Sequence, residues 1–131
     1  MIEQFEAMPL LVGACPSFAE RWHEHLSSYG NETLYAASGA FAHHLLSLQQ
    51  ASDVSSFPAV AATIERLCNE GSPWVKQFVA IGLLEDIQNV WSNNSINPEL
   101  FGHFLGPESR RWWQGLNNFW SGNASLIKTE G

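Results

Sequence analysis

Helix start and stop signals recur along the chain and restrict it to an all-α fold. Serine and proline residues that favour a helix N-terminus precede apolar runs, and glycines that favour a C-terminus follow them. The clearest run extends from Ser56 to Gly71, where apolar residues recur at helical spacing. Ser72 and Pro73 then begin a helix that we expect to reach about Asn93. No segment alternates polar and apolar residues between hairpin turns, so we expect no β-sheet.

The remaining segments give further short helices. We expect Ser17 and Glu20 to form a capping box for a helix that ends at Gly30. Other helices are expected within residues 29–52, 98–104 and 107–122, and residues 1–12 should form a helix that is kinked or restarted at Pro9. We predict one helical domain, residues 1–131, built as a compact bundle of about six to seven short antiparallel helices. Stacked helical hairpins are the alternative, and the helices on either side of Gly71 should form a central hairpin.

The helix from Pro73 to Asn93 changes character partway along its length. Its first half is apolar over most of its circumference, so it should lie in the middle of the domain. Glu85, Asp86 and Asn89 then occupy the side on which further apolar residues would be expected. Polar residues therefore interrupt a buried face.

Two interpretations of this acidic pair remain open. In the first, Glu85 and Asp86 pair with Arg110 or Arg111, or with backbone N–H groups at a helix N-terminus, because an unpaired buried charge is very unfavourable. In the second, the buried face ends here and Glu85, Asp86 and Asn89 open into a shallow acidic groove. Such a groove would receive a lysine or arginine of a partner.

The tryptophan-rich segment 106–122 gives one more candidate contact. Trp112, Leu116, Phe119 and Trp120 share a helix face and are interpreted as core anchors. Trp113 lies off that stripe. It could stack on Arg110 in a cation–π pair, pack in the core, or form an exposed anchor for a protein partner.

Motifs for catalysis and metal binding are missing from the sequence. Cys15 and Cys68 lack the spacing of a metal site and are interpreted as buried thiols. No histidine pair has the i, i+4 spacing of a zinc-binding helix, and His25 and His44 lie on apolar stripes, as core histidines do. We find no phosphate-binding loop and no nucleophile elbow. The sequence thus predicts no catalytic residue, no metal and no cofactor.

Charge and hydropathy limit the partners. Six Lys and Arg residues against thirteen Asp and Glu residues give a net charge of −7, which argues against nucleic acid as a partner and favours a basic macromolecule.

No apolar stretch approaches the roughly 20 residues of a membrane span. The run Val12 to Cys15 resembles a lipoprotein cleavage site, but the residues before it contain no Lys or Arg, and Pro9 interrupts them. We therefore expect a soluble cytoplasmic protein.

Four groups of residues together resemble a known family. They are Ala14–Phe18, Phe57–Val60 with Ile64–Leu67, Gly82–Asn89, and Phe104–Ser109 leading into Arg110–Trp113. The chain resembles a largely uncharacterised family of small, acidic, all-helical bacterial proteins that are immunity-like partners of secreted toxins. The resemblance implies a helical fold and neutralisation of a toxin by direct binding, and it supplies no catalytic residues. A helical adaptor or regulatory scaffold for a cellular protein is the main alternative, and an enzyme of unknown type is a weaker one.

Overall fold

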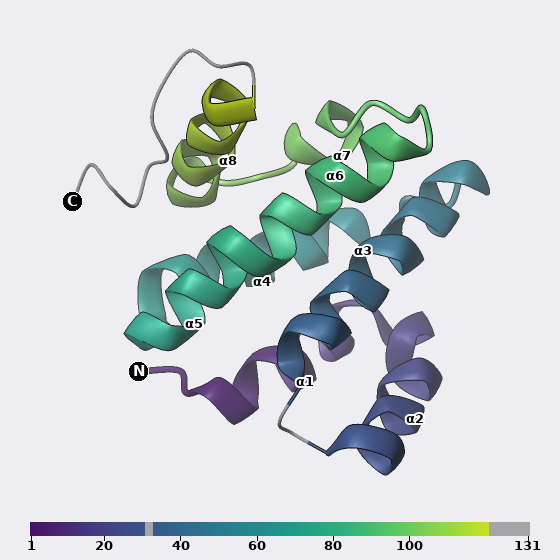
Figure 1. Cartoon of the computed structure of the whole chain (residues 1–131), viewed down its shortest axis with the longest axis vertical. Coiled ribbons are helices and arrows are strands. Elements are labelled where there is room, and N and C mark those ends of the chain that lie inside the picture. Colours follow the sequence, from purple (N-terminus) through teal and green to yellow (C-terminus); the bar gives the residue numbers. More distant parts are fainter. Residues whose placement is uncertain (31–32, 121–131) are drawn as a thin grey trace.

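The predicted all-α fold is confirmed by a computed structural model. It describes residues 1–30 and 33–120, with only the backbone of residues 119 and 120. Within these residues there is no β-strand, only an isolated bridge between Ile2 and Gly71. The elements, most of them labelled in Figure 1, are α1 (Gln4–Ala14), the 3-10 turn η1 (Pro16–Phe18), α2 (Ala19–Tyr29), α3 (Leu34–Gln50), α4 (Phe57–Glu70), α5 (Pro73–Gln77), the π-helical segment η2 (Phe78–Leu84), α6 (Glu85–Asn93), α7 (Glu99–Gly102) and α8 (Pro107–Trp120).

The elements α5, η2 and α6 follow one another as a single long helix, which we call the central rod. It begins as predicted, because the Ser72 hydroxyl accepts a hydrogen bond from the Val75 amide at 3.2 Å. The rod crosses the molecule diagonally between the other helices (Figure 1). Its apolar first half is buried, as expected, and contributes Val75, Phe78, Val79, Ala80, Leu83 and Leu84 to the core. Helical periodicity did not predict the π geometry of η2.

Two helices flank the rod along its length. In the predicted central hairpin, α4 runs antiparallel to the rod, so Phe57 at its start meets Trp91 near the end of α6, with ring centroids 6.1 Å apart. Helix α3 runs parallel to the rod. Its residue Tyr35 packs edge-on against Phe78 at 5.3 Å, while further along the Ala42 carbonyl accepts a hydrogen bond from the Trp91 indole at 3.3 Å.

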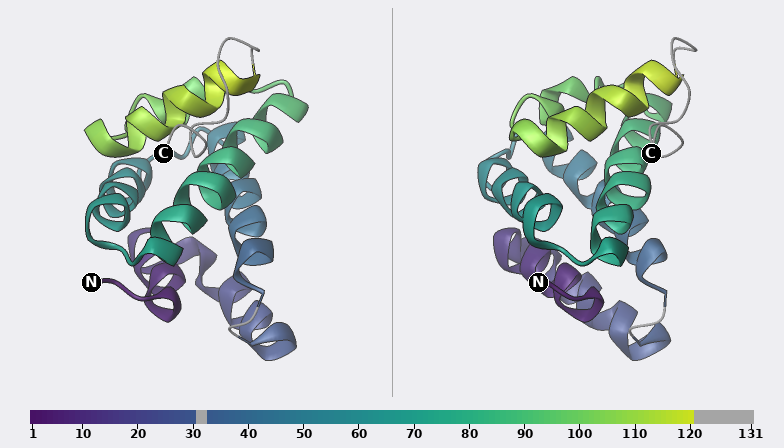
Figure 2. Two further views of the ribbon diagram at one scale, coloured as in Figure 1. Left: turned by 60° about the vertical axis from the view of Figure 1, so that its left-hand side comes forward. Right: turned by 90° about the vertical axis from the view of Figure 1, so that its left-hand side faces the viewer.

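The remaining helices close the two ends of this three-helix layer (Figure 2). Helix α8 lies crosswise over α4 and the rod, and α1 and α2 lie at the opposite end. The Glu65 carboxylate of α4 accepts hydrogen bonds from the amides of Glu108 at 3.0 Å and Ser109 at 2.9 Å. This carboxylate therefore caps the first turn of α8 and fixes it on α4.

Several predicted helix ends differ from the structure. The capping box at Ser17 and Glu20 is wrong, because Ser17 lies in η1 and its hydroxyl bonds instead to His44 Nε2 at 2.7 Å. A capping box does form at Glu3 and Glu6. Helix α1 contains Pro9 without a restart, and α7 is shorter than the predicted 98–104. The helix end predicted at residue 122 lies outside the described residues.

Candidate functional site

Asp86 lies at the boundary between the rod and α3, half-buried. Its Oδ2 atom is 2.9 Å from the Ser38 hydroxyl, which is also 2.8 Å from the Tyr35 carbonyl and can donate to either. Burial raises the pKa of Asp86, and the Ser38 hydrogen bond and the nearby His43 oppose that rise only in part. The hydrogen-bond partner of this carboxylate is therefore a neutral hydroxyl.

The arginines expected to neutralise the acidic pair have other partners. Arg110 donates to the Gly102 carbonyl at 2.7 Å, and Arg111 forms an ion pair with Glu108 at 2.7 Å on the surface of α8. Pairing of Asp86 with either arginine is thus wrong. Glu85 and Asn89 are half-buried on the same part of α6, so the polar part of the rod reaches the surface.

Trp113 is buried, so packing in the core is the correct one of its three alternatives and the exposed anchor is wrong. Its side chain is 0% exposed, and its indole donates to Glu99 Oε2 at 2.6 Å. A Cβ on Gly102 would lie 2.6 Å from the Trp113 ring, so the absence of a side chain at residue 102 allows α7 to approach α8 this closely. The stacking of Trp113 on Arg110 is also wrong, since it is Arg111 that lies over Trp112, 5.4 Å from the ring centroid.

The buried face of α8 is rotated from the predicted stripe. It carries Ser109, Trp113 and Leu116, at i, i+4 and i+7, and Trp112 is only half-buried. The helix contacts both α4 and the rod, and this tertiary packing decides which of its faces is buried. The side chains of Phe119 and Trp120, also predicted to be core anchors, lie outside the described residues.

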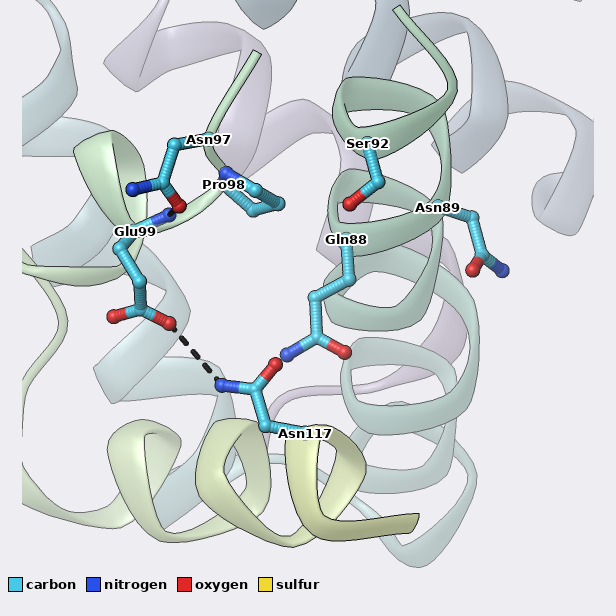
Figure 3. Close-up of a pocket in the computed structure, with 7 residues that line it drawn as sticks. All are labelled: Gln88, Asn89, Ser92, Asn97, Pro98, Glu99 and Asn117. Atoms are coloured by element: carbon cyan, nitrogen blue, oxygen red, sulfur yellow. Dashed lines mark hydrogen bonds between the residues drawn. The ribbon is translucent and has the colours of Figure 1, made fainter. Parts of the chain in front are cut away.

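Next to the polar part of the rod is a hollow that the sequence did not predict. We call it the polar hollow (Figure 3). It has a volume of about 490 Å³ and is lined by Gln88, Asn89, Ser92, Asn97, Pro98, Glu99 and Asn117. Only Asn89 had been singled out from the sequence. The signal in the sequence that could have indicated this hollow is the density of amide side chains in residues 88–97 and 117–118.

Hydrogen bonds fix the shape of the polar hollow. Glu99 Oε2 accepts from the Trp113 indole and from Asn117 Nδ2 at 3.1 Å, so one carboxylate joins α7 to α8. Gln88 Nε2 donates to the Trp113 carbonyl at 3.1 Å, which joins α6 to α8. Asn97 Oδ1 accepts from the Glu99 amide at 3.0 Å and sets the start of α7. The hollow is therefore a preformed junction of three helices.

A second, apolar hollow adjoins the first and shares Asn97 and Glu99 with it. It has a volume of about 340 Å³, and its remaining lining residues are Gln49, Val54, Leu100, His103 and Phe104. Leu100 is 47% exposed, which is high for a leucine. The two hollows together form one continuous surface of mixed polarity over α7.

The cysteines are buried, but His25 and His44, predicted to be core histidines, are only half-buried. Both cysteines are free and buried, as predicted, and burial raises the pKa of Cys68 to about 12. His44 bonds to Ser17, and His25 Nε2 lies 3.3 Å from the Thr33 hydroxyl while its ring stacks on Trp22. The described part of the chain holds no group of three His, Cys, Asp or Glu residues arranged to bind a metal ion.

The fold and the hollows define a small all-α protein with a preformed polar depression on its surface. The chain belongs to the family described as "Domain of unknown function (DUF7674)", whose model matches residues 8–121. No curated protein and no solved structure gave a significant match. Among the described residues, no helix combines the length and apolar character needed to cross a bilayer.

Proposed function

We propose that this chain is a non-catalytic, immunity-type protein that neutralises a basic bacterial toxin by binding it directly in the cytoplasm. The observation that carries the proposal is the polar end of the central rod. There a helix that is otherwise part of the core presents Glu85, Asp86 and Asn89 at half-buried positions, and Asn89 also lines the preformed polar hollow. A stretch of this kind lowers the stability of a core, and binding a partner gives a reason for keeping it.

The charge of the chain supports a basic partner. The net charge of −7 would attract a cationic protein over long range and raise the association rate. A toxin that acts on an anionic substrate such as nucleic acid would carry the required positive surface. Half-buried carboxylates such as Asp86 would then contribute to slow dissociation, because they are screened by salt less than exposed ones.

The test is capture from the native host with the tagged full chain at low salt, followed by co-expression of the captured protein. We expect a basic protein whose toxicity is suppressed by the wild-type chain. The variant Glu85→Lys should lose suppression while keeping its helical fold. The matched control Glu24→Lys changes the net charge equally on exposed α2, at the far end of the molecule, and should still suppress (Figure 1).

Two results would overturn the proposal. One is a captured protein that is not toxic, or whose toxicity the chain leaves unchanged. The other is equal suppression by Glu85→Lys and the wild type with the partner still bound. Unfolding of Glu85→Lys would instead show that Glu85 is a structural residue, and Asn89→Lys would then replace it in the test.

A helical adaptor for a cellular protein is the second candidate, and the apolar hollow favours it. Exposed Leu100 and Val54 beside that hollow suit an apolar segment of a partner. An adaptor of this type should lose its partner on Leu100→Asp and keep it on Glu85→Lys, the reverse of the immunity proposal. A toxin gene immediately upstream favours immunity, and an operon of metabolic or signalling genes favours the adaptor.

A further inference from the structure

We infer that the polar hollow is a socket for an arginine side chain of the protein partner, an inference that rests on the proposed function. The socket is defined by Gln88, Glu99 and Asn117, which come from α6, α7 and α8 and point towards one space (Figure 3). Asn89 also lines the hollow, but its side chain points away from these three.

The socket is lined by hydrogen-bond acceptors and a negative charge. Glu99 supplies a half-buried carboxylate, and the seven lining residues that the structure describes include no lysine or arginine. Asn117 uses its Nδ2 atom on Glu99, which turns its Oδ1 atom towards Gln88 and the hollow (Figure 3). A cation entering here meets acceptors from more than one side.

Gln88 gives an independent sign that a donor is missing. Its side chain is 4% exposed and extends from α6 towards Asn117 at the floor of the hollow (Figure 3). Its Nε2 atom bonds to the Trp113 carbonyl, whereas its Oε1 atom is buried and has no hydrogen-bond partner in the described part of the chain. Such an acceptor is costly unless something donates to it.

The helix geometry also favours a positive charge. Gln88, Asn89 and Ser92 lie in the last turns of α6, which ends at Asn93, so the negative end of its helix dipole is near the socket. A guanidinium fits better than an ammonium, because it presents five N–H donors in one plane to acceptors on several sides. The adjoining apolar hollow, with exposed Leu100, fits apolar residues next to that arginine and so favours a protein as its source.

The test is a titration of the full chain, labelled with ¹⁵N at its tryptophan indoles, with the peptide acetyl-Leu-Arg-Leu-amide. The Trp113 indole N–H, which donates to Glu99, reports directly on the socket and is assigned with Trp113→Phe. We expect a saturable shift of this resonance with a Kd on the order of 1 mM. The same peptide with neutral citrulline should bind at least tenfold more weakly, and free arginine at least threefold more weakly.

Three variants separate the socket from general charge attraction. Glu99→Gln keeps an acceptor for Trp113 and Asn117 but removes the charge, and should weaken peptide binding at least tenfold. Ser92→Lys places a cation at an exposed position of the rim, where it should not disturb the fold, and should also abolish binding. Glu24→Gln on α2 should have no effect.

Three results would overturn the inference. They are that the Trp113 resonance shows no saturable shift, that the citrulline peptide binds as tightly as the arginine peptide, or that Ser92→Lys binds the arginine peptide as the wild type does. Equal affinity for free arginine would show a small-molecule site and not a partner contact. If a captured toxin binds the Glu99→Gln and Ser92→Lys variants as tightly as the wild type, the inference of an arginine socket is wrong and the proposed function is still supported. If the peptide binds as expected but no toxin is captured, the proposed function fails and an arginine site remains.

Discussion

Two carboxylates, Glu65 and Asp86, respond to their surroundings in opposite directions. Partial burial raises the pKa of Glu65, but hydrogen bonds from Ser109, Glu108 and Asn69 together lower it below the ordinary value. The pKa of Asp86 is raised, because burial outweighs its single hydroxyl contact and the nearby His43. The charged form is thus stabilised by the fold at Glu65 and disfavoured at Asp86.

For Glu65 we predict that Glu65→Gln lowers the free energy of unfolding by about 1–2 kcal/mol at pH 7, as loss of a helix cap does. The stabilising effect of a lowered pKa is complete above the ordinary pKa and is lost as pH falls through the lowered one. The difference from wild type should therefore shrink towards pH 3. Urea denaturation at both pH values measures it, with exposed Glu24→Gln as the control. Equal stabilities at pH 7 would show that Glu65 does not hold α8.

For Asp86 the pH dependence of stability has the opposite sign to that of Glu65. A raised pKa means that the folded state loses stability as pH rises from the ordinary pKa through the raised one. Asn keeps an acceptor for Ser38 without the charge, so Asp86→Asn should leave stability at pH 7 unchanged or raise it by up to about 1 kcal/mol. That gain should disappear below about pH 4, near the ordinary pKa of Asp. A loss of more than about 1 kcal/mol in urea denaturation at pH 7 would contradict this account.

At the scale of elements, local signals predicted where most helices begin and end. As expected, Gly71 follows the end of α4 and Ser72 caps the start of α5, and Gly30 ends α2 with a φ of +67°. The same kind of signal failed at Ser17, where a contact with His44, distant in sequence, replaced the cap. Local patterns therefore gave the helices, and tertiary contacts decided which polar side chains cap them.

Two serines that precede proline-containing helix starts test this distinction. Ser72 accepts the Val75 amide, whereas Ser56 makes no side-chain cap hydrogen bond. We predict that Ser72→Ala lowers the free energy of unfolding by about 1 kcal/mol and that Ser56→Ala changes it by less than about 0.5 kcal/mol. Chemical denaturation of both variants checks the prediction. Equal losses would mean that the Ser72 hydrogen bond contributes nothing measurable.

Two helical glycines test the close packing of α7 on α8. A Cβ at Gly102 would meet the Trp113 ring at 2.6 Å, whereas one at exposed Gly13 of α1 would meet nothing within 4 Å. Gly102→Ala should lower the free energy of unfolding by about 1–3 kcal/mol through overpacking, and Gly13→Ala should raise it by about 0.5–1 kcal/mol. Thermal or urea unfolding measures both. A neutral Gly102→Ala would show that α7 is free to move away from α8.

At the scale of the whole molecule, the fold class could be predicted and the site only in part. The sequence located the change from apolar to polar on the rod at Glu85, Asp86 and Asn89. It could not show that Glu99 of α7 and Asn117 of α8 meet Gln88, because that depends on how α8 crosses the rod. The place of Trp113 stayed open among three alternatives for the same reason, since the periodicity of one helix does not reveal which of its faces the neighbouring helices will cover.

The central claim is that the polar end of the rod holds a basic protein partner by charge. The most direct measurement is the Kd of the captured partner for the wild type and for Glu85→Lys, at NaCl concentrations from 50 to about 500 mM. We predict that the wild-type complex weakens at least tenfold over this range, and that Glu85→Lys weakens it about tenfold at low salt, with the difference narrowing as salt screens the charges. A wild-type Kd that does not change with salt, together with a folded Glu85→Lys variant of wild-type affinity, would contradict the claim.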